Sequence, residues 1–101
     1  MLARRRKTTF MGFSKESAVE HAKKDLAARL KIGTRDIREH VSEHDFPDMA
    51  LGASEPGEMA AQMISSGWKI DLEAGGKAYE YRADKYQLRL YSFEGRNYVV
   101  Q

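Results

Sequence analysis

The chain begins its apolar pattern with a stretch of helical spacing. Four apolar residues recur at intervals of three or four positions: Val19, Ala22, Leu26 and Leu30. This spacing places them on one face of a helix, with charged residues behind. We therefore predict a helix over residues 14–31, with Ser14 capping its first turn, Ser17 and Glu20 forming a capping box, and Gly33 ending it.

The second half of the chain alternates with the period of a β-strand. Apolar residues occupy every second position over 68–74 and again over 77–84, with Gly75 and Gly76 between the two runs. Two glycines are typical of a two-residue hairpin loop. Closing that loop places Ile70 opposite Tyr81, and the apolar residues of both strands then share one face.

The remaining segments complete a sheet. A single turn is predicted over residues 34–37, and further strands over 38–46, 59–65, 87–93 and 98–100, the first as an edge strand. The fold class predicted is α+β, with one N-terminal amphipathic helix packed on a four- to five-stranded antiparallel meander sheet. The predicted core consists of Trp68, Ile70, Leu72, Tyr79, Tyr81, Val19, Leu26 and Leu30.

Length and composition describe one small domain. The 101 residues suffice for a single modest core. We predict a basic flexible tail over 1–13, from which Phe10 and Phe13 dock on the body, and a single domain over 14–101. The chain has no cysteine, so disulfides and thiolate metal sites are excluded. No apolar segment follows the basic start, which favours a cytoplasmic location without membrane attachment.

Charge is unevenly distributed. Residues 1–38 hold eleven Lys and Arg against four acids, or +7, while residues 39–101 carry −5. A basic N-terminal part attracts nucleic acid or an acidic partner, and it is equally consistent with a solvated helix face. The residues of this alternative nucleic-acid site are Arg4, Arg5, Arg6, Lys7, Lys23 and Lys24.

Two groups of residues carry the chemistry of hydrolases. His40 and His44 lie in an H-x-x-E-H pattern, which in zinc peptidases requires a helix and a third ligand. The segment is instead expected as a strand, and no third ligand follows it. Carboxylates gather in the central loop at Asp45, Asp48, Glu55 and Glu58, and they are expected as solvated loop acids. We therefore predict no enzyme activity, no metal and no cofactor.

A turn-rich loop with apolar anchors remains after these exclusions. The predicted function is a non-enzymatic protein-interaction module, of which a protease inhibitor is a special case, acting as a monomer or weak homodimer on an unidentified protein partner. Its expected partner-binding residues, at one end of the sheet, are Phe46, Asp48, Leu51, Ser65, Ser66 and Gly67.

Residues 26–91 also carry a series of motifs. These are F-P-D at 46–48, L-G at 51–52, P-G at 56–57, Gln62, G-W at 67–68, L-E-A-G-G at 72–76 and Y-E-Y at 79–81. The series resembles a family of small bacterial proteins with no established activity, so the resemblance implies a fold and no function. Many members of that family are exported and carry a cysteine where this chain has Ala53, so its absence here favours a reduced, intracellular version.

A second resemblance concerns a shorter segment. A helix followed by an antiparallel meander is similar to cystatins, and residues 62–67 are similar to their Q-x-V-x-G inhibitory hairpin with one residue more. The resemblance implies a protease-blocking loop over 62–67, followed by a strand that begins at Trp68.

Overall fold

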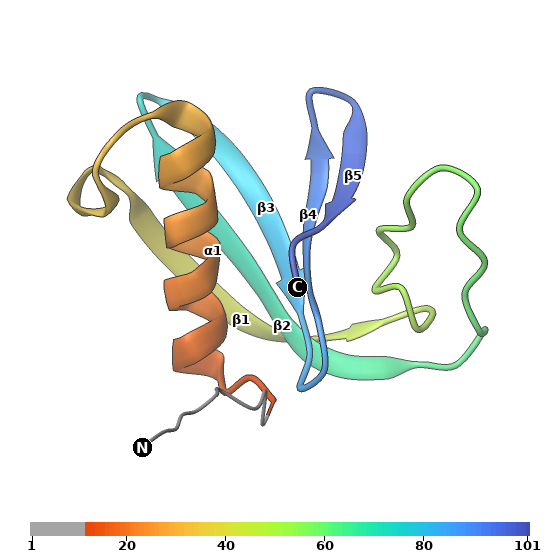
Figure 1. Ribbon diagram of the computed structural model, residues 1–101. Helices are drawn as coiled ribbons and strands as arrows, with labels where there is room; N and C mark the ends of the chain where they lie inside the picture. The colour runs from red at the N-terminus through yellow and green to blue at the C-terminus, as the bar shows by residue number, and fades with distance from the viewer. Residues whose placement is uncertain (1–11) are drawn as a thin grey trace, which may run out of the picture.

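The computed structural model describes residues 12–101, which form one helix packed on a five-stranded antiparallel sheet (Figure 1). The elements in chain order are α1 (Lys15–Leu30), the 3₁₀ turn η2 (Thr34–Asp36), β1 (Arg38–Phe46), β2 (Ser65–Ala74), β3 (Lys77–Ala83), β4 (Leu88–Phe93) and β5 (Arg96–Val99). The strands lie in the order β1-β2-β3-β4-β5. The predicted α+β class is confirmed, as are the turn at η2 and the edge strand β1.

Helix α1 begins with a reciprocal cap. The Ser14 hydroxyl accepts a hydrogen bond from the Ser17 backbone N–H at 3.1 Å, and the Ser17 hydroxyl accepts one from the Ser14 N–H at 2.9 Å. These two bonds satisfy N–H groups that the first helical turn leaves without partners. The capping box predicted for Ser17 and Glu20 is therefore one turn too late, and Glu20 instead pairs with Lys24 on the helix surface at 3.7 Å.

Helix α1 ends with its C-cap at Lys31, two residues before Gly33. Lys31 adopts the left-handed conformation with φ of 59°, and its backbone N–H donates to the carbonyl of Ala27. Gly33 has φ of −82° and precedes η2, so the prediction that Gly33 ends the helix is wrong. The backbone bond to Ala27 offsets the modest cost of a left-handed lysine.

The central hairpin has the register that the sequence predicts. Ala74 faces Lys77, Ile70 faces Tyr81, and Gly75 and Gly76 have φ of 59° and 79°. Positive φ at both loop positions defines the turn whose twist matches that of antiparallel strands. A slip by one residue would expose the apolar face of both strands, so burial fixes the register.

Two strand boundaries differ from the prediction. Residues 59–64 form no strand, and β2 begins at Ser65, three residues before the predicted start at Trp68. At the other end, the turn is shorter than predicted because β5 already begins at Arg96. The segment 59–64 has apolar residues but no neighbouring strand to pair with, since β1 already occupies the adjacent edge of β2.

The main core lies between α1 and one face of the sheet. Five of the predicted core residues are buried in it, namely Val19, Leu26, Ile70, Leu72 and Tyr81, together with Ala22, Leu88 and Leu90. The predicted Trp68, Tyr79 and Leu30 are only partly buried at its border. Phe13, which the sequence assigns to the tail, is buried in this core, and its N–H donates to the Lys85 carbonyl at 2.8 Å.

A polar contact ties the helix to the sheet inside this core. The Tyr81 hydroxyl donates to Asp25 Oδ2 at 2.6 Å, and Arg29 Nε donates to the same oxygen at 2.6 Å. Burial, together with the hydrogen bond to Asp25, raises the pKa of Tyr81 well above its usual value of 10. The phenol therefore remains a neutral hydrogen-bond donor at neutral pH.

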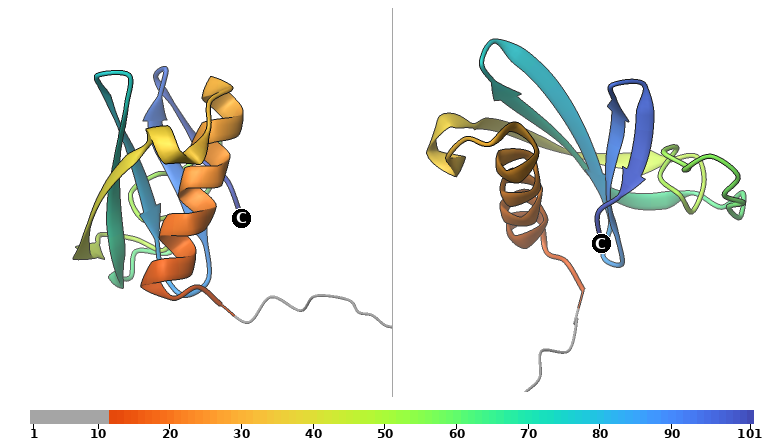
Figure 2. Two further views of the ribbon diagram at one scale, coloured as in Figure 1. Left: turned by 90° about the vertical axis from the view of Figure 1, so that its left-hand side faces the viewer. Right: turned by 45° about the horizontal axis from the view of Figure 1, so that its top comes forward.

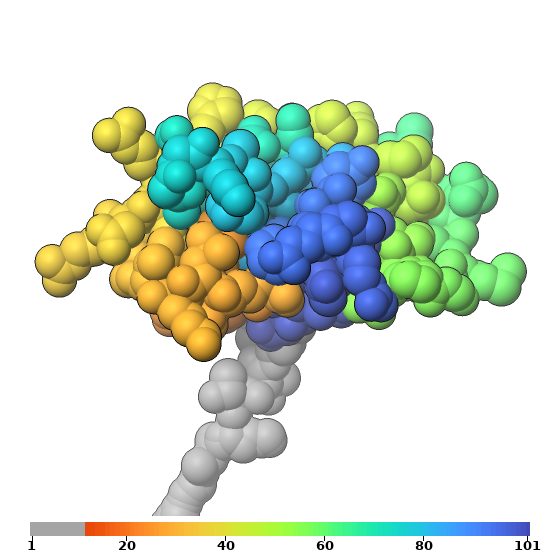
Figure 3. All heavy atoms as spheres, turned by 90° about the horizontal axis from the view of Figure 1, so that it is seen from above, coloured from red at the N-terminus to blue at the C-terminus, as the bar shows by residue number. Residues whose placement is uncertain are grey.

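The second face of the sheet is covered as well. The connection 47–64 between β1 and β2 folds back over this face, so that sheet strands separate it from α1 (Figures 2 and 3). Beneath it lies a small cluster of buried apolar residues outside the main core: Phe46, Ala50, Leu51 and Ala53. The sheet is therefore the middle of three layers, and we name residues 47–64 the covering loop.

No helix within residues 12–101 has the length and apolar character needed to cross a membrane.

Candidate interaction surface

Several residues predicted to bind a partner are interior residues of the covering loop. Phe46 and Leu51 are fully buried, with exposed fractions of 1% and 0%. Asp48 is half-buried, and its carboxylate accepts hydrogen bonds from the N–H groups of Ala50 and Gly52 at 2.9 and 3.0 Å. These three side chains shape the loop from inside, so they are not themselves available to a partner in this conformation.

The other three predicted residues lie where β2 begins. The Ser65 hydroxyl is buried and donates to Asp84 Oδ2 at 2.6 Å, while the exposed Ser66 hydroxyl donates to Asp45 Oδ1 at 2.7 Å. Gly67 passes so close to the Ala83 carbonyl that a Cβ atom would overlap it. Of the six predicted residues, only Ser66 therefore has an exposed side chain.

An arginine from β3 holds the first part of the covering loop. Arg82 Nη1 donates to the Leu51 carbonyl at 2.9 Å. Its guanidinium carbon lies 3.7 Å from the ring centroid of Tyr91 and 5.6 Å from that of Phe46. The planar cation is thus stacked between aromatic rings while it binds a backbone acceptor, an arrangement that lysine could not reproduce.

A buried arginine from β4 holds the middle of the loop. Arg89 Nη1 and Nη2 donate to the two carboxylate oxygens of Glu58, each at 2.6 Å, and Nη1 also donates to the Ala53 carbonyl at 3.2 Å. The hydrogen bonds from Arg89, with one from the Glu55 N–H, lower the pKa of Glu58 to about 2. Glu58 was expected as a solvated loop acid and is instead the partner of a buried cation.

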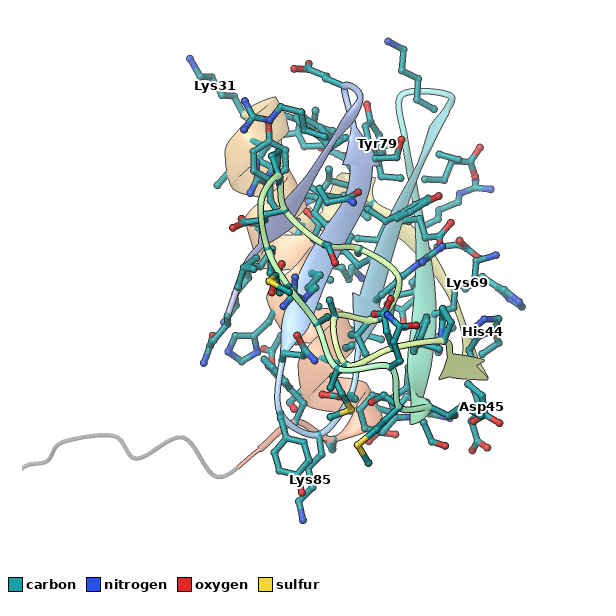
Figure 4. The ribbon with its side chains drawn as sticks, turned by 90° about the vertical axis from the view of Figure 1, so that its right-hand side faces the viewer. Lys31, His44, Asp45, Lys69, Tyr79 and Lys85 are labelled. Carbon is teal, nitrogen blue, oxygen red and sulfur yellow. The ribbon has the colours of Figure 1, made fainter. Side chains whose placement is uncertain are left out.

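The rest of the loop is fastened to β4, β5 and itself. Four further hydrogen bonds of 2.6–2.9 Å join these parts: Gln87 Nε2 to the Met49 carbonyl, Asn97 Nδ2 to the Ser54 carbonyl, the Val99 N–H to Glu55 Oε2, and the Met49 N–H to the Ala61 carbonyl. Figure 4 looks onto this face, where the loop crosses in front of the strands. Long connections without secondary structure are uncommon in compact domains, and those that are held in place are often functional.

The fastened loop holds apolar side chains in solvent. Met59, Met63 and Ile64 are 94%, 63% and 72% exposed, and Tyr86 in the β3–β4 turn is 70% exposed. Met49 connects the two segments, because its N–H bonds to residue 61 and its carbonyl to residue 87. We name Met59, Met63, Ile64 and Tyr86 the loop-end surface.

Sequence reasoning missed the loop-end surface because it interpreted residues 59–65 as a strand. One signal was available in the sequence. Met63 and Ile64 are adjacent, so a strand would place them on opposite faces, and neither Met59 nor Met63 is β-branched or aromatic. The predicted inhibitory hairpin over 62–67 also depended on that strand. The structure places residues 62–64 in the covering loop and 65–67 in β2, so no turn joins two strands there.

The basic residues of the nucleic-acid alternative divide into two groups. Lys23 forms an ion pair with Glu39 at 3.0 Å, and Lys24 pairs with Glu20 at 3.7 Å. Both lysines therefore have acidic neighbours that reduce their attraction for phosphate. The four residues from Arg4 to Lys7 lie outside the described part of the chain.

The two histidines of the H-x-x-E-H pattern lie on β1 and not on a helix. Positions four apart on a strand are separated by about 13 Å, which is too far for two ligands of one metal ion. In residues 12–101 no group of three or more His, Cys, Asp or Glu side chains is arranged to hold a metal. The zinc-peptidase interpretation therefore lacks the geometry it requires. Figure 4 shows His44 beside Asp45 at the outer side of the sheet.

Comparison with known proteins places the chain in a family. No curated protein and no solved structure matches it. A family model does match, over residues 19–91, which span most of α1, the covering loop and strands β1 to β4 up to Tyr91. The chain therefore belongs to the family described as a domain of unknown function, DUF8738.

Proposed function

We propose that this protein is a protein-interaction module that binds its partner through the loop-end surface. The observation that carries the proposal is the combination of exposure and anchoring. Met59, Met63 and Ile64 are held in solvent by a loop whose flanks are bound to Arg82, Arg89 and Asn97. Several large apolar side chains exposed within one short segment are typical of a binding site, whereas apolar residues scattered singly over a surface are not.

The anchoring matters for affinity. A partner that covers these side chains gains about 1.5–3 kcal/mol for each large apolar residue that it buries completely. A loop that was mobile before binding would lose much of this gain to ordering, whereas a loop already fixed to the sheet does not. Methionine adds adaptability, because its unbranched side chain fits apolar surfaces of different shapes. The surface thus suits a protein partner with an apolar contact region.

Nucleic acid is the competing partner and has less support. The two described lysines of that alternative each face a carboxylate. Lys85 places a cation beside the Tyr86 ring, with Nζ 5.9 Å from the ring centroid, but one stacked base and one phosphate contact bind nucleic acid weakly.

The experiment compares capture by matched variants. The immobilised protein is exposed to lysate of its source, with and without nuclease, at low and high salt. The test variant carries Met59→Ser, Met63→Ser and Ile64→Ser, while the control carries Arg35→Ser, Glu73→Ser and Lys77→Ser, which are exposed positions in η2 and at the β2–β3 hairpin end. We expect the wild type to capture one discrete protein, and this capture to persist after nuclease treatment and at high salt. The control variant should capture the same protein equally well, and the test variant should not capture it.

Each captured protein is then purified and titrated against the three chains by calorimetry. Loss of three buried apolar side chains should weaken binding by at least about 100-fold, since each contributes about 1.5 kcal/mol or more. Equal binding of the test variant and the control would contradict the proposed surface. Capture that nuclease abolishes would favour nucleic acid instead.

A further inference from the structure

The two edges of the sheet differ in how they are protected. At β5 the strand has four residues, and the outward Val99 N–H donates to Glu55 Oε2 at 2.8 Å. At β1 the strand has nine residues and runs along the outside of the sheet (Figure 2). Within residues 12–101, no hydrogen bond joins the backbone of β1 to any element other than β2. Alternate N–H and C=O groups of β1 are therefore available for an additional strand.

A groove lies beside this edge, between β1 and α1. Its volume is about 350 Å³, and Val19 from α1 and Val41 from β1 provide its apolar part. The surrounding residues are Lys15, Glu16, Glu20, Lys23, Lys24, Thr34 and Glu39. Successive side chains of a strand point to opposite faces, so a strand added to β1 would direct every second side chain to the face on which this groove lies, and those opposite Glu39 and Val41 would enter it.

The charges along β1 determine which side chains an added strand needs in order to complement it. Val41 faces Ile70 of the main core, so Glu39, Val41, Glu43 and Asp45 share the face that is turned towards α1. Lys23 neutralises Glu39, but within the described chain no cation lies within ion-pair distance of Glu43 or Asp45. An apolar residue opposite Val41 and basic residues opposite Glu43 and Asp45 would complement this face.

A second copy of the chain, in each two-fold register that pairs seven or more of the nine residues of β1, places carboxylates opposite each other. Two β1 strands related by a two-fold axis pair residues of the same face. Centred on Val41, the pairing places Glu39 opposite Glu43 twice; centred on Ser42, it places Glu39 opposite Asp45 twice. Carboxylates directly opposite each other destabilise an antiparallel pair. The occupant must therefore differ from β1 in charge.

We propose that β1 is a second docking site, at which an extended segment of a partner protein adds as a sixth strand, with one apolar side chain directed into the groove beside α1 and two basic side chains opposite Glu43 and Asp45. This is strand addition to an open sheet edge, in which backbone bonds supply affinity and alternate side chains supply specificity. The site is separate from the loop-end surface, and neither requires the other.

The test uses two synthetic peptides of nine residues, one for each strand direction. Both have threonine at odd positions. In the antiparallel peptide, positions 2, 4, 6 and 8 are lysine, lysine, valine and threonine, which places the two lysines opposite Asp45 and Glu43. In the parallel peptide the same four residues stand in reverse order, so that they meet the same partners. A control peptide has glutamate in place of each lysine. Amide hydrogen exchange of the full chain, followed by NMR, reports whether the backbone of β1 becomes bonded.

We expect one lysine peptide to slow exchange at alternate amides of residues 38–46 and to leave β5 unchanged. The variant Glu43→Lys should bind that peptide about tenfold more weakly and bind the glutamate peptide more tightly than the wild type does. Glu94→Lys makes the same charge change at the exposed β4–β5 turn and should bind like the wild type. Both positions are exposed, so both variants should fold.

Three results would overturn the proposal. The first is unchanged exchange at β1 with both lysine peptides at millimolar concentration. The second is equal binding by the Glu43→Lys and Glu94→Lys variants, which would show that attraction depends on net charge alone. The third is a dimer, seen by sedimentation, whose formation slows exchange at alternate amides of β1, because the occupant would then be a second copy.

Discussion

Replacement of Glu58 by Gln tests whether the covering loop is held by its ion pair with Arg89. The wild-type carboxylate accepts two hydrogen bonds of 2.6 Å from a guanidinium whose side chain is 7% exposed. Glutamine retains the size of the side chain but removes the charge and one acceptor. Arg89 keeps its hydrogen bonds to the Ala53 carbonyl and to Gln87, so the buried guanidinium loses its charged partner but retains other acceptors.

The magnitude follows from the pKa. A carboxyl group whose pKa falls from 4.5 to about 2 on folding stabilises the folded state by about 3 kcal/mol at neutral pH before solvent screening. The Glu58 side chain is 29% exposed, so screening reduces this figure to about 1–2 kcal/mol. Because the folded pKa is the lower one, this stability is present above pH 5 and is lost as the pH falls from about 5 to 2.

The assay is urea denaturation of wild type and Glu58→Gln at pH 7 and pH 3, followed by the fluorescence of Trp68. We expect the variant to be less stable by about 1–2 kcal/mol at pH 7, and the difference between the two proteins to fall to roughly half or less at pH 3. Glu94→Gln, in the exposed β4–β5 turn, is the control and should match the wild type at both values. A difference of the same size at pH 3 and pH 7 would refute the assignment of stability to the ionised pair.

Three further substitutions test the framework around the site. Tyr81→Phe keeps the buried ring but removes the hydrogen bond to Asp25, so we expect a loss of about 1–3 kcal/mol in urea denaturation, and an unchanged midpoint would contradict it. Gly67→Ala places a methyl group against the Ala83 carbonyl and should lower the melting temperature by at least about 5 °C, whereas an unaltered melting curve would show that β2 and β3 can separate there. Ser14→Ala removes the helix cap and should cost about 1 kcal/mol, with Ser14→Gly costing less; equal stability of all three chains would exclude the cap as a contributor.

The hairpin of β2 and β3 was predictable because residues close together in the sequence determine it. Side chains from Trp68 to Ala83 alternate between the two faces of the sheet, and the two glycines define the turn. Burial of one face then determines the register. The same alternation also predicts which face of the hairpin packs against α1, because only one face is apolar. The helix and its Ser14 cap are likewise predicted from the sequence, although the capping box is formed by Ser14 and Ser17 and not by Ser17 and Glu20.

The covering loop was not predictable in the same way. Arg82 and Arg89 occupy the polar positions of an alternating pattern, which normally face solvent. They are covered because carbonyls and a carboxylate 31 to 36 residues away in sequence meet their guanidinium groups. No periodicity encodes a contact of that range. Phe46 and Leu51 were therefore interpreted as anchors for a partner, when their actual partner is the second face of the sheet.

The distribution of loop anchors has a consequence for the order of events during synthesis. The covering loop is complete once residue 64 has been made, but the groups that hold it lie between Arg82 and Val99. Phe46 and Leu51 therefore emerge from the ribosome well before the strands that will cover them, and they remain uncovered until almost the whole chain has been translated. A nascent or truncated chain that ends before Arg82 would expose both side chains to chaperones and proteases, whereas in the folded chain both are buried.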